Sequence, residues 1–269
     1  MAIITISRGS YSMGVIVAEE VGRRLGYSVI SRDLLLDASD RFHIPEIKLI
    51  RAIHDAPGIL ERVSHSKQAY LAYIRSALTE RAAGDNIVYH GLAGHVLLKG
   101  IEEVLKVRIT ADMDYRVARE MKREGITEQE ARSILEKDDQ QRRKWTKSLW
   151  GADPWDSSLY DLVIRIDRFK VEDAVDFICK AAESEAFRTT EKSLQKLKDL
   201  ALACRVKAEL VDELHHLGVT CQYGNVIVYT RDKSRGTRLH KQLEELRGRI
   251  DGIFNLEIHS AADIPPEAV

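Results

Sequence analysis

Short apolar runs alternate with amphipathic stretches over the first 186 residues of the chain. The apolar runs, which predict five strands, lie at residues 3–6, 27–30, 86–91, 104–111 and 161–167. Between them apolar residues recur at helical spacing, as Val17, Val21 and Leu25 do after the first run. Strands that alternate with helices predict an α/β fold with a doubly wound, five-stranded parallel sheet. Ligands of such sheets bind at the carboxyl ends of the strands.

A long, charge-rich helix is expected over residues 126–150. Thr127, followed three residues later by Glu130, is typical of a capping box at the start of a helix. Further helices are expected at residues 31–38, 66–83, 112–125 and 171–186.

The pattern changes after a polar link at residues 187–193. The elements expected beyond it are a helix at 191–215, a hairpin turning at Gly224-Asn225, a helix at 235–250 and a strand at 252–259. The tail at 262–269 is expected to fray. We therefore predict two domains, residues 1–186 and a small α+β domain (α-β-β-α-β) at residues 191–262.

The stretch at residues 3–26 has the order strand, small-residue turn, helix. This arrangement directs backbone N–H groups and a helix N-terminus at an anion, most often a nucleotide phosphate. Gly9 and Gly14 have the spacing of a phosphate loop, but Val15 and Ile16 stand where Lys and Ser/Thr would follow. The stretch is therefore a degenerate phosphate loop.

Composition narrows the class of protein only slightly. The net charge is −1, from 41 basic and 42 acidic residues, which gives no support for nonspecific binding to nucleic acid or membranes. No apolar run is long enough to span a membrane, and no basic leader precedes the first strand. The three cysteines are too widely spaced for a metal motif or a disulfide framework. These features favour a cytoplasmic protein.

Arginines are the strongest candidates for chemistry, because phosphoryl transfer needs positive charge around the transferred group and the planar guanidinium binds phosphate oxygens in pairs. The candidate phosphate- and ATP-binding residues are Arg8, Ser10, Ser12, Gly14, Arg116 and Arg119. The candidates at an acceptor site are Asp33 and His90. Each arginine also fits a solvated charged face, and a strand-end histidine or a first-turn aspartate is often structural.

Several motifs together resemble the cytidylate kinase-like family of nucleoside monophosphate kinases. They are ITISR with its loop at the start, GDNIVYHG at the third strand, TADMDYRVAREMKREGITEQEA at the fourth, KDDQQRRKW, and DPWDSSLYDLVIRID. In KDDQQRRKW, Asp139, Arg142 and Arg143 match the D-x-x-R-R pattern of the family's lid. The resemblance implies a kinase fold with a helical lid, these three lid residues as catalytic candidates, and transfer of phosphate from ATP with Mg²⁺ to CMP or dCMP.

The sequence departs from the family pattern on both sides of the reaction centre. Tyr11 and Met13 stand where the family loop has glycine, Ser31 replaces an aspartate, and His90 replaces an arginine. No metal site is assigned to protein residues. The alternative is therefore a catalytically impaired nucleotide sensor or scaffold, and the sequence leaves open whether the chain is an active enzyme.

The C-terminal part, residues 191–260, resembles a BON domain in the order of its helices, hairpin and closing strand. The glycine usual after the second strand is replaced by Arg231-Asp232. The resemblance implies a binding role rather than catalysis. The sequence identifies neither the partner of this part nor whether the chain forms a homo-oligomer.

Overall fold

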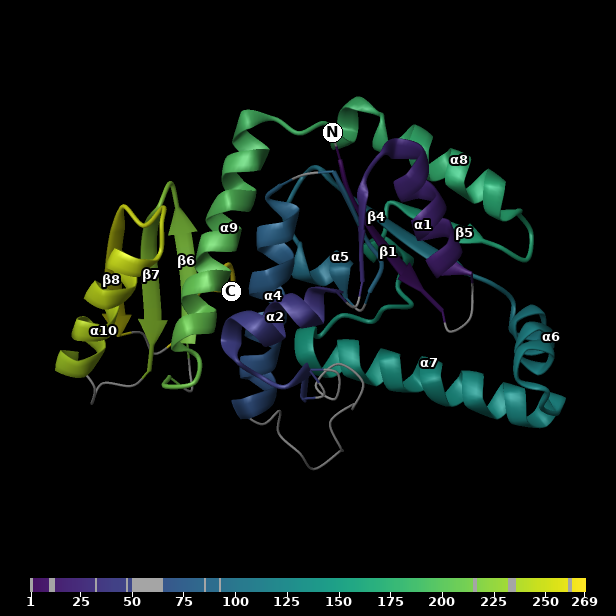
Figure 1. Cartoon of the computed structure of the whole chain (residues 1–269), viewed down its shortest axis with the longest axis horizontal. Helices are drawn as coiled ribbons and strands as arrows, with labels where there is room; N and C mark the ends of the chain where they lie inside the picture. Colours follow the sequence, from purple (N-terminus) through teal and green to yellow (C-terminus); the bar gives the residue numbers. More distant parts are fainter. Residues whose placement is uncertain are drawn as a thin grey trace.

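The computed structural model describes residues 2–9, 13–31, 33–46, 48–49, 65–84, 86–91, 93–214, 217–231, 236–260 and 263–269. Two sheets organise these residues (Figure 1). None of the described helices is long and apolar enough to cross a membrane.

The larger sheet has five parallel strands in the order β2-β3-β1-β4-β5. Their bounds are β1 (Ile3–Arg8), β2 (Ser28–Ile30), β3 (Ile87–Tyr89), β4 (Val104–Thr110) and β5 (Leu162–Arg165). The doubly wound parallel sheet predicted from the alternating pattern is confirmed. Strand β1 pairs with β3 on one side and β4 on the other, so its carboxyl end lies in the middle of the sheet.

Helices cover both faces of this sheet (Figure 1). The described helices of this part are α1 (Gly14–Leu25), α2 (Asp33–Phe42), α4 (His65–Ala82), α5 (Gly94–Leu97), α6 (Met113–Glu124), α7 (Glu128–Trp150) and α8 (Val171–Ala182), with short 3₁₀ turns at Ser157–Leu159 and Glu185–Phe187. Of these, α6 and α7 lie beyond the carboxyl edge of the sheet rather than on a face (Figure 1). One buried cluster joins α1 and α8 to β1 and β4, as Val17, Ile178, Ile4 and Leu105 illustrate. The helices α2, α4 and α5 pack into the other cluster.

The capping box expected at the start of α7 is present. The Glu130 carboxylate accepts a hydrogen bond from the Thr127 backbone N–H at 2.9 Å, and Thr127 Oγ1 accepts one from the Glu130 N–H at 3.4 Å. The helix ends at Gly151, whose φ of 66° suits a left-handed C-cap. Thr127 and Gly151 therefore fix both ends of the helix that crosses the sheet's carboxyl edge.

The smaller sheet belongs to the C-terminal part, and its strand order is β6-β7-β8. The elements are α9 (Glu191–Leu210), β6 (Leu217–Gln222), β7 (Asn225–Thr230), α10 (Gly236–Arg249) and β8 (Asn255–Ser260). Strands β6 and β7 are antiparallel and β8 runs parallel to β7. The predicted α-β-β-α-β order is confirmed, whereas the resemblance to a BON domain stays a prediction.

Two details of the C-terminal part differ from expectation. The hairpin turns at Tyr223-Gly224, not Gly224-Asn225, because Gln222 pairs with Asn225 and both turn residues have positive φ. The tail is docked rather than frayed, since the backbone N–H of Val269 donates to the Val219 carbonyl at 3.0 Å. A tail without sequence periodicity can still bind an open strand edge, and the sequence pattern carries no sign of this.

Helix α9 packs along α4, and one hydrophobic cluster contains buried residues of both parts of the chain. Tyr73 of α4 also donates a hydrogen bond to Asp212, just beyond α9, at 2.5 Å. The boundary predicted near residue 187 stays a prediction, but the two parts share a buried interface (Figure 1).

Gly22 and Gly248, each within a helix, give a matched test of how closely α1 packs on β2. A Cβ on Gly22 of α1 would overlap the Val29 side chain of β2, whereas a Cβ on Gly248 of α10 would meet no atom within 4 Å. We expect Gly22→Ala to lower the free energy of unfolding by about 1–3 kcal/mol, because a packed core resists extra volume. Gly248→Ala should raise it by roughly 0.5–1 kcal/mol through helix propensity. Urea unfolding of both variants measures the difference, and equal effects would contradict the close packing of α1 on β2.

Candidate active site

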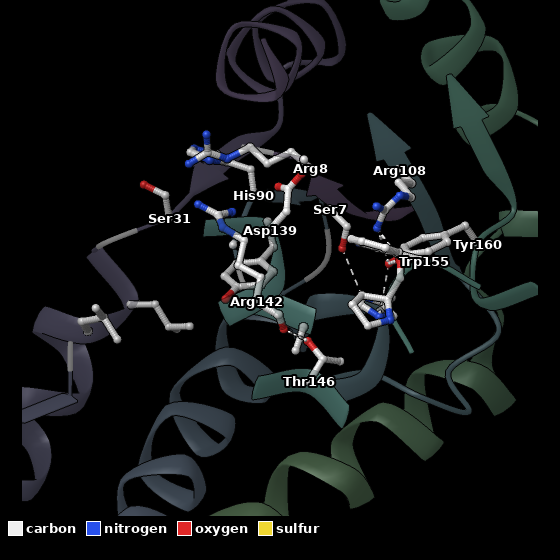
Figure 2. A pocket seen from close by; sticks show the side chains of 18 residues that line it. Ser7, Arg8, Ser31, His90, Arg108, Asp139, Arg142, Thr146, Trp155 and Tyr160 are labelled. Atoms are coloured by element: carbon white, nitrogen blue, oxygen red, sulfur yellow. Dashed lines mark hydrogen bonds between the residues drawn. The ribbon is translucent and has the colours of Figure 1, made fainter. Parts of the chain in front are cut away.

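A cavity of about 330 Å³ opens at the carboxyl ends of β1, β2 and β3, beneath α7. Its lining comprises Ser7, Arg8, Gly9, Ser31, Leu34, Leu35, Tyr89, His90, Gly91, Ala93, His95, Arg108, Asp139, Arg142, Thr146, Pro154, Trp155 and Tyr160. Figure 2 shows Arg8, His90, Asp139 and Arg142 gathered on one side and Arg108, Trp155 and Tyr160 on the other. We call it the lid cavity, because α7 carries the lid residues that the sequence singles out.

Arg142 is placed as the sequence predicts, on α7 with its side chain at the lid cavity. Within the described ranges, its guanidinium has no hydrogen bond or ion pair, and only its backbone carbonyl is engaged, by Thr146 Oγ1 at 3.0 Å. A half-buried guanidinium without a protein partner can bind an incoming anion at little cost, because no internal ion pair must first break.

Arg116 lies away from the lid cavity, in a buried ion pair with Asp139 of α7. The Arg116 Nη1 to Asp139 Oδ2 distance is 2.8 Å, and the two side chains are only 8% and 13% exposed. The sequence predicts Arg116 as a phosphate ligand, but the structure directs its guanidinium at this carboxylate. Asp139, which the resemblance makes a catalytic candidate, lines the cavity and joins α7 to α6, so its contacts fit a positioning role better than a role as a base.

Arg143, the second lid arginine of the prediction, is also held by a carboxylate. Its guanidinium donates to both oxygens of Asp153 at 2.6–3.0 Å and lies 4.2 Å from the ring centroid of Trp155. The Arg143 guanidinium in turn lowers the pKa of Asp153 to about 2. Arg143 does not line the lid cavity, and it instead fixes the loop that places Trp155 at the cavity wall.

His90 sits at the end of β3, where its backbone N–H donates to the Ile30 carbonyl at 3.0 Å. Burial and the neighbouring positive charge of Arg8 lower the pKa of His90, against smaller opposing effects of Glu19 and Asp33. Its Nδ1 is buried, and no described residue forms a hydrogen bond with it. His90 is therefore a neutral hydrogen-bonding group at the cavity, not a second fixed positive charge.

The opposite wall contains three polar side chains joined through His95 of α5. Ser7 Oγ lies 3.0 Å from His95 Nδ1, and the Tyr160 hydroxyl lies 3.5 Å from His95 Nε2 and donates to the Pro154 carbonyl at 3.0 Å. Burial, with the positive charges of Arg108 and Lys106, lowers the pKa of His95 to about 4. This wall is therefore uncharged at His95 and held rigid by hydrogen bonds.

Arg108 brings a further positive charge to this wall from β4. Its guanidinium donates to the Pro154 carbonyl and to the Tyr160 hydroxyl, and it lies 5.6 Å from the Tyr160 ring centroid. Sequence reasoning missed Arg108, His95 and Tyr160. A signal for Arg108 was present, because an arginine inside a strand of a two-sided parallel sheet requires a specific partner.

A second cleft, of about 560 Å³, lies between α1 and α6. We call it the α1/α6 cleft, and it is lined by Arg8, Met13, Gly14, Val15, Ile16, Arg119, Glu120, Lys122 and Arg123. The predicted residues Gly14 and Arg119 both lie here rather than in the lid cavity. Arg123 forms ion pairs with Glu120 and Glu124 at 2.7 and 3.0 Å. The other cationic side chains of the lining, on Arg8, Arg119 and Lys122, lie around one helix N-terminus and form a surface suited to an anion with several charges. Arg8 lines this cleft and the lid cavity alike.

The start of α1 is built for close contact with the end of β1. Met13 has a φ of 63°, and a Cβ on the buried Gly14 would come within 2.8 Å of the Arg8 Cβ. Glycine at position 14 therefore leaves the space that Arg8 occupies between the two cavities. The remaining loop candidates, Ser10 and Ser12, and the departure at Tyr11 lie outside the described residues.

Of the acidic residues that the structure describes, neither Asp33 nor any other forms an evident site for a metal ion. Asp33 is exposed at the first position of α2 and does not line the lid cavity, whereas Ser31 does. The described part of the chain contains no group of three or more His, Cys, Asp or Glu side chains that could hold a metal. The donor set does not fit a Mg²⁺ site made by the protein alone.

The neutral state of His95 has a consequence for stability. The folded chain favours the uncharged imidazole over the charged one. The stability that His95 contributes in this way is fully present above its ordinary pKa of 6.5 and is lost as the pH falls through about 4. His95→Gln removes the titration and keeps a polar side chain. The free energy of unfolding of the wild type should fall when the pH is lowered from about 7 to about 4.5. In His95→Gln this fall should be smaller by about 2 kcal/mol. Urea unfolding at the two pH values tests this, and equal losses would contradict a buried, uncharged His95.

Comparisons with known proteins agree with this geometry. Residues 3–168 match the family described as the cytidylate kinase-like family. The chain is similar to a cytidylate kinase of Methanopyrus kandleri, with 37% identity over 106 residues, which are 37% of this chain and 54% of that protein. The chain is also similar to a cytidylate kinase of Pyrobaculum aerophilum, with 26% identity over 185 residues, which are 66% of this chain and 94% of that protein.

The first of these two alignments is partial, because this chain spans only about half of the Methanopyrus kandleri protein. Among solved structures, an uncharacterized protein from Eubacterium ventriosum has a TM-score of 0.53 and 21% identity, over 69% of this chain and 100% of that one. This likeness shows the fold alone. Because the family match covers more than half of its residues, the chain belongs to the cytidylate kinase-like family.

Proposed function

We propose that this chain is a kinase that transfers phosphate from ATP to a nucleoside monophosphate, with CMP or dCMP as the acceptor. The observation that carries the proposal is the position of Arg8. Its side chain lines both the α1/α6 cleft and the lid cavity, and it is the last residue of the central strand of the sheet. A phosphoryl group passing between a donor in one space and an acceptor in the other would pass this guanidinium.

The α1/α6 cleft is the proposed donor site. The N-terminus of α1 and the side chains of Arg8, Arg119 and Lys122 give it positive potential, which suits the triphosphate of ATP. Val15 occupies the position from which a serine or threonine would bind Mg²⁺ in a complete phosphate loop. Kinases usually use ATP with Mg²⁺, but no step in this proposal depends on a protein ligand for the metal.

The lid cavity is the proposed acceptor site. Arg142 supplies a guanidinium that can bind a phosphate, and the neutral His90 can donate or accept one hydrogen bond. Trp155, Tyr89 and Leu34 provide apolar surface for a base or sugar. Replacement of the usual arginine by His90 lowers the positive charge on this side, so a larger share of phosphate binding falls to Arg142.

The contributions of the protein to the transfer step would be positioning and charge. Arg8 and Arg142 approach the same side of the cavity and can neutralise charge on the transferred group. Helix α7 covers the cavity from above β1 and β3, which limits the access of water to the transferred group. No described side chain is assigned the role of a general base.

One observation favours the alternative of a catalytically impaired nucleotide sensor. Arg116 and Arg143, two of the five arginines expected to bind phosphate, have carboxylate partners within the fold. One experiment distinguishes the kinase from the sensor, because both bind nucleotide but only the kinase forms ADP.

The direct test combines thermal unfolding with a coupled assay for ADP, using ATP with Mg²⁺ and CMP, dCMP, UMP or AMP as acceptors. Any ligand that binds only the folded chain raises the unfolding temperature. We expect stabilisation by ATP and by CMP or dCMP, together with ADP formation that depends on the acceptor. Stabilisation without ADP would favour the sensor, and no stabilisation by any nucleotide would contradict both functions.

Arg142→Ala tests the acceptor side. Because the described fold contains no partner for this guanidinium, the apo unfolding temperature should change little, while kcat/KM for the acceptor should fall roughly 100-fold. Lys144→Ala, two positions along α7 at an exposed site outside the lid cavity, is the matched control and should retain activity. A parallel loss of apo stability and activity in Arg142→Ala would instead assign Arg142 a structural role.

A further inference from the structure

A third cavity, of about 440 Å³, lies where α4 meets α9 and the docked tail. We call it the seam cavity, and it is lined by Gln68, Leu71, Ala72, Arg75, Leu97, Ser148, Trp150, Cys204, Lys207, Val211, Leu214, Leu217, Ile264, Ala268 and Val269. None of the described residues lines both the seam cavity and the lid cavity. Its volume falls within the range usual for small-molecule sites.

The tail forms one wall of the seam cavity and is held in place by specific contacts. The Val269 N–H donates to the Val219 carbonyl at 3.0 Å. Ile264 packs so closely on Gly218 of β6 that a Cβ at that glycine would overlap its side chain. The site is therefore assembled from both parts of the chain and exists only when α9, β6 and the tail are docked.

Most of the described residues that line the cavity are apolar, but two cationic side chains, Lys207 of α9 and Arg75 of α4, face the same space. Among the residues that the structure describes, no aspartate or glutamate side chain lines the cavity. Within the described ranges, neither cation has an ion pair with a carboxylate, and Arg75 Nε donates to the Leu97 carbonyl at 3.2 Å. Two like charges beside an apolar wall are costly to bury unless an anion joins them.

The pKa of Lys207 reflects this cost. Burial, aided by the positive charge of Arg75, lowers the pKa of Lys207 to about 8, against a smaller opposing effect of Cys204. A bound anion would stabilise the charged form of Lys207, raise its pKa and offset its repulsion from Arg75.

We propose that the seam cavity is a second binding site, for a small molecule that combines one carboxylate or phosphate group with an apolar body. The anionic group binds Lys207 and Arg75. The apolar body lies among Leu71, Leu214 and Ile264. This combination of a paired cationic end and an apolar chamber distinguishes the site from the α1/α6 cleft, where cations surround a helix N-terminus.

The probe for the test is octanoate, which has one carboxylate and an unbranched apolar chain. Isothermal titration of the full chain should give saturable binding with one site. The neutral octan-1-ol and the cationic octylammonium should bind at least about tenfold more weakly, because they lack the anionic group. No binding of octanoate, or equal binding of all three probes, would overturn the proposal.

Lys207→Met removes the charge and keeps an unbranched apolar side chain at a half-buried position. We expect it to weaken octanoate binding about tenfold, whereas Lys198→Met, at an exposed site on the same helix, should leave binding unchanged. Equal effects of the two substitutions would contradict a role for Lys207 in binding.

A second measurement does not depend on the stability of the Lys207 variant. Trp150 lines the seam cavity and Trp155 lines the lid cavity. Octanoate should change the tryptophan emission of the wild-type chain and of Trp155→Phe, and this change should be lost in Trp150→Phe. A change that persists in Trp150→Phe and disappears in Trp155→Phe would place the probe in the lid cavity and overturn the proposal.

Discussion

The parallel pairing of β1 with β3 on one side and β4 on the other is the constraint on which the candidate site depends. Parallel strands bring their carboxyl ends to one edge of the sheet. This register sets Arg8 at the centre, with His90 beyond β3 and Arg108 on β4 beside it. Residues about 80 to 100 positions apart in the chain thereby line one cavity.

Two ion pairs engage the arginines that lie near Arg142, on α6 and α7, and leave Arg142 itself open to a ligand. Arg116 with Asp139 joins α7 to α6, and Arg143 with Asp153 joins α7 to the following loop. The buried pair gives little net stability, because desolvation opposes the Coulomb attraction, but breaking it leaves a buried charge. Its effect is to fix α7 above the strand ends. Arg142, between these anchors, is left to face the cavity.

Burial has opposite functional consequences in the lid cavity and in the seam. His90 and His95 lose their charge readily in the low-dielectric interior and serve as neutral polar walls. Lys207 starts from a much higher pKa, so burial brings it only to about 8 and leaves an ammonium group that an anion can stabilise. The same desolvation therefore produces uncharged walls at one site and a cationic end at the other.

The sequence by itself determined the elements of the fold, because helix and strand periods, the Thr127 cap and the punctuating glycines act locally. It also indicated Arg8 and Arg142 as site residues. Only the tertiary structure decided that Arg116 and Arg143 bind carboxylates, that Tyr160 and His95 form a cavity wall, and that the tail docks on β6. The physical reason is that the partner of a charge, and the occupant of an open strand edge, come from distant segments whose approach no local pattern encodes.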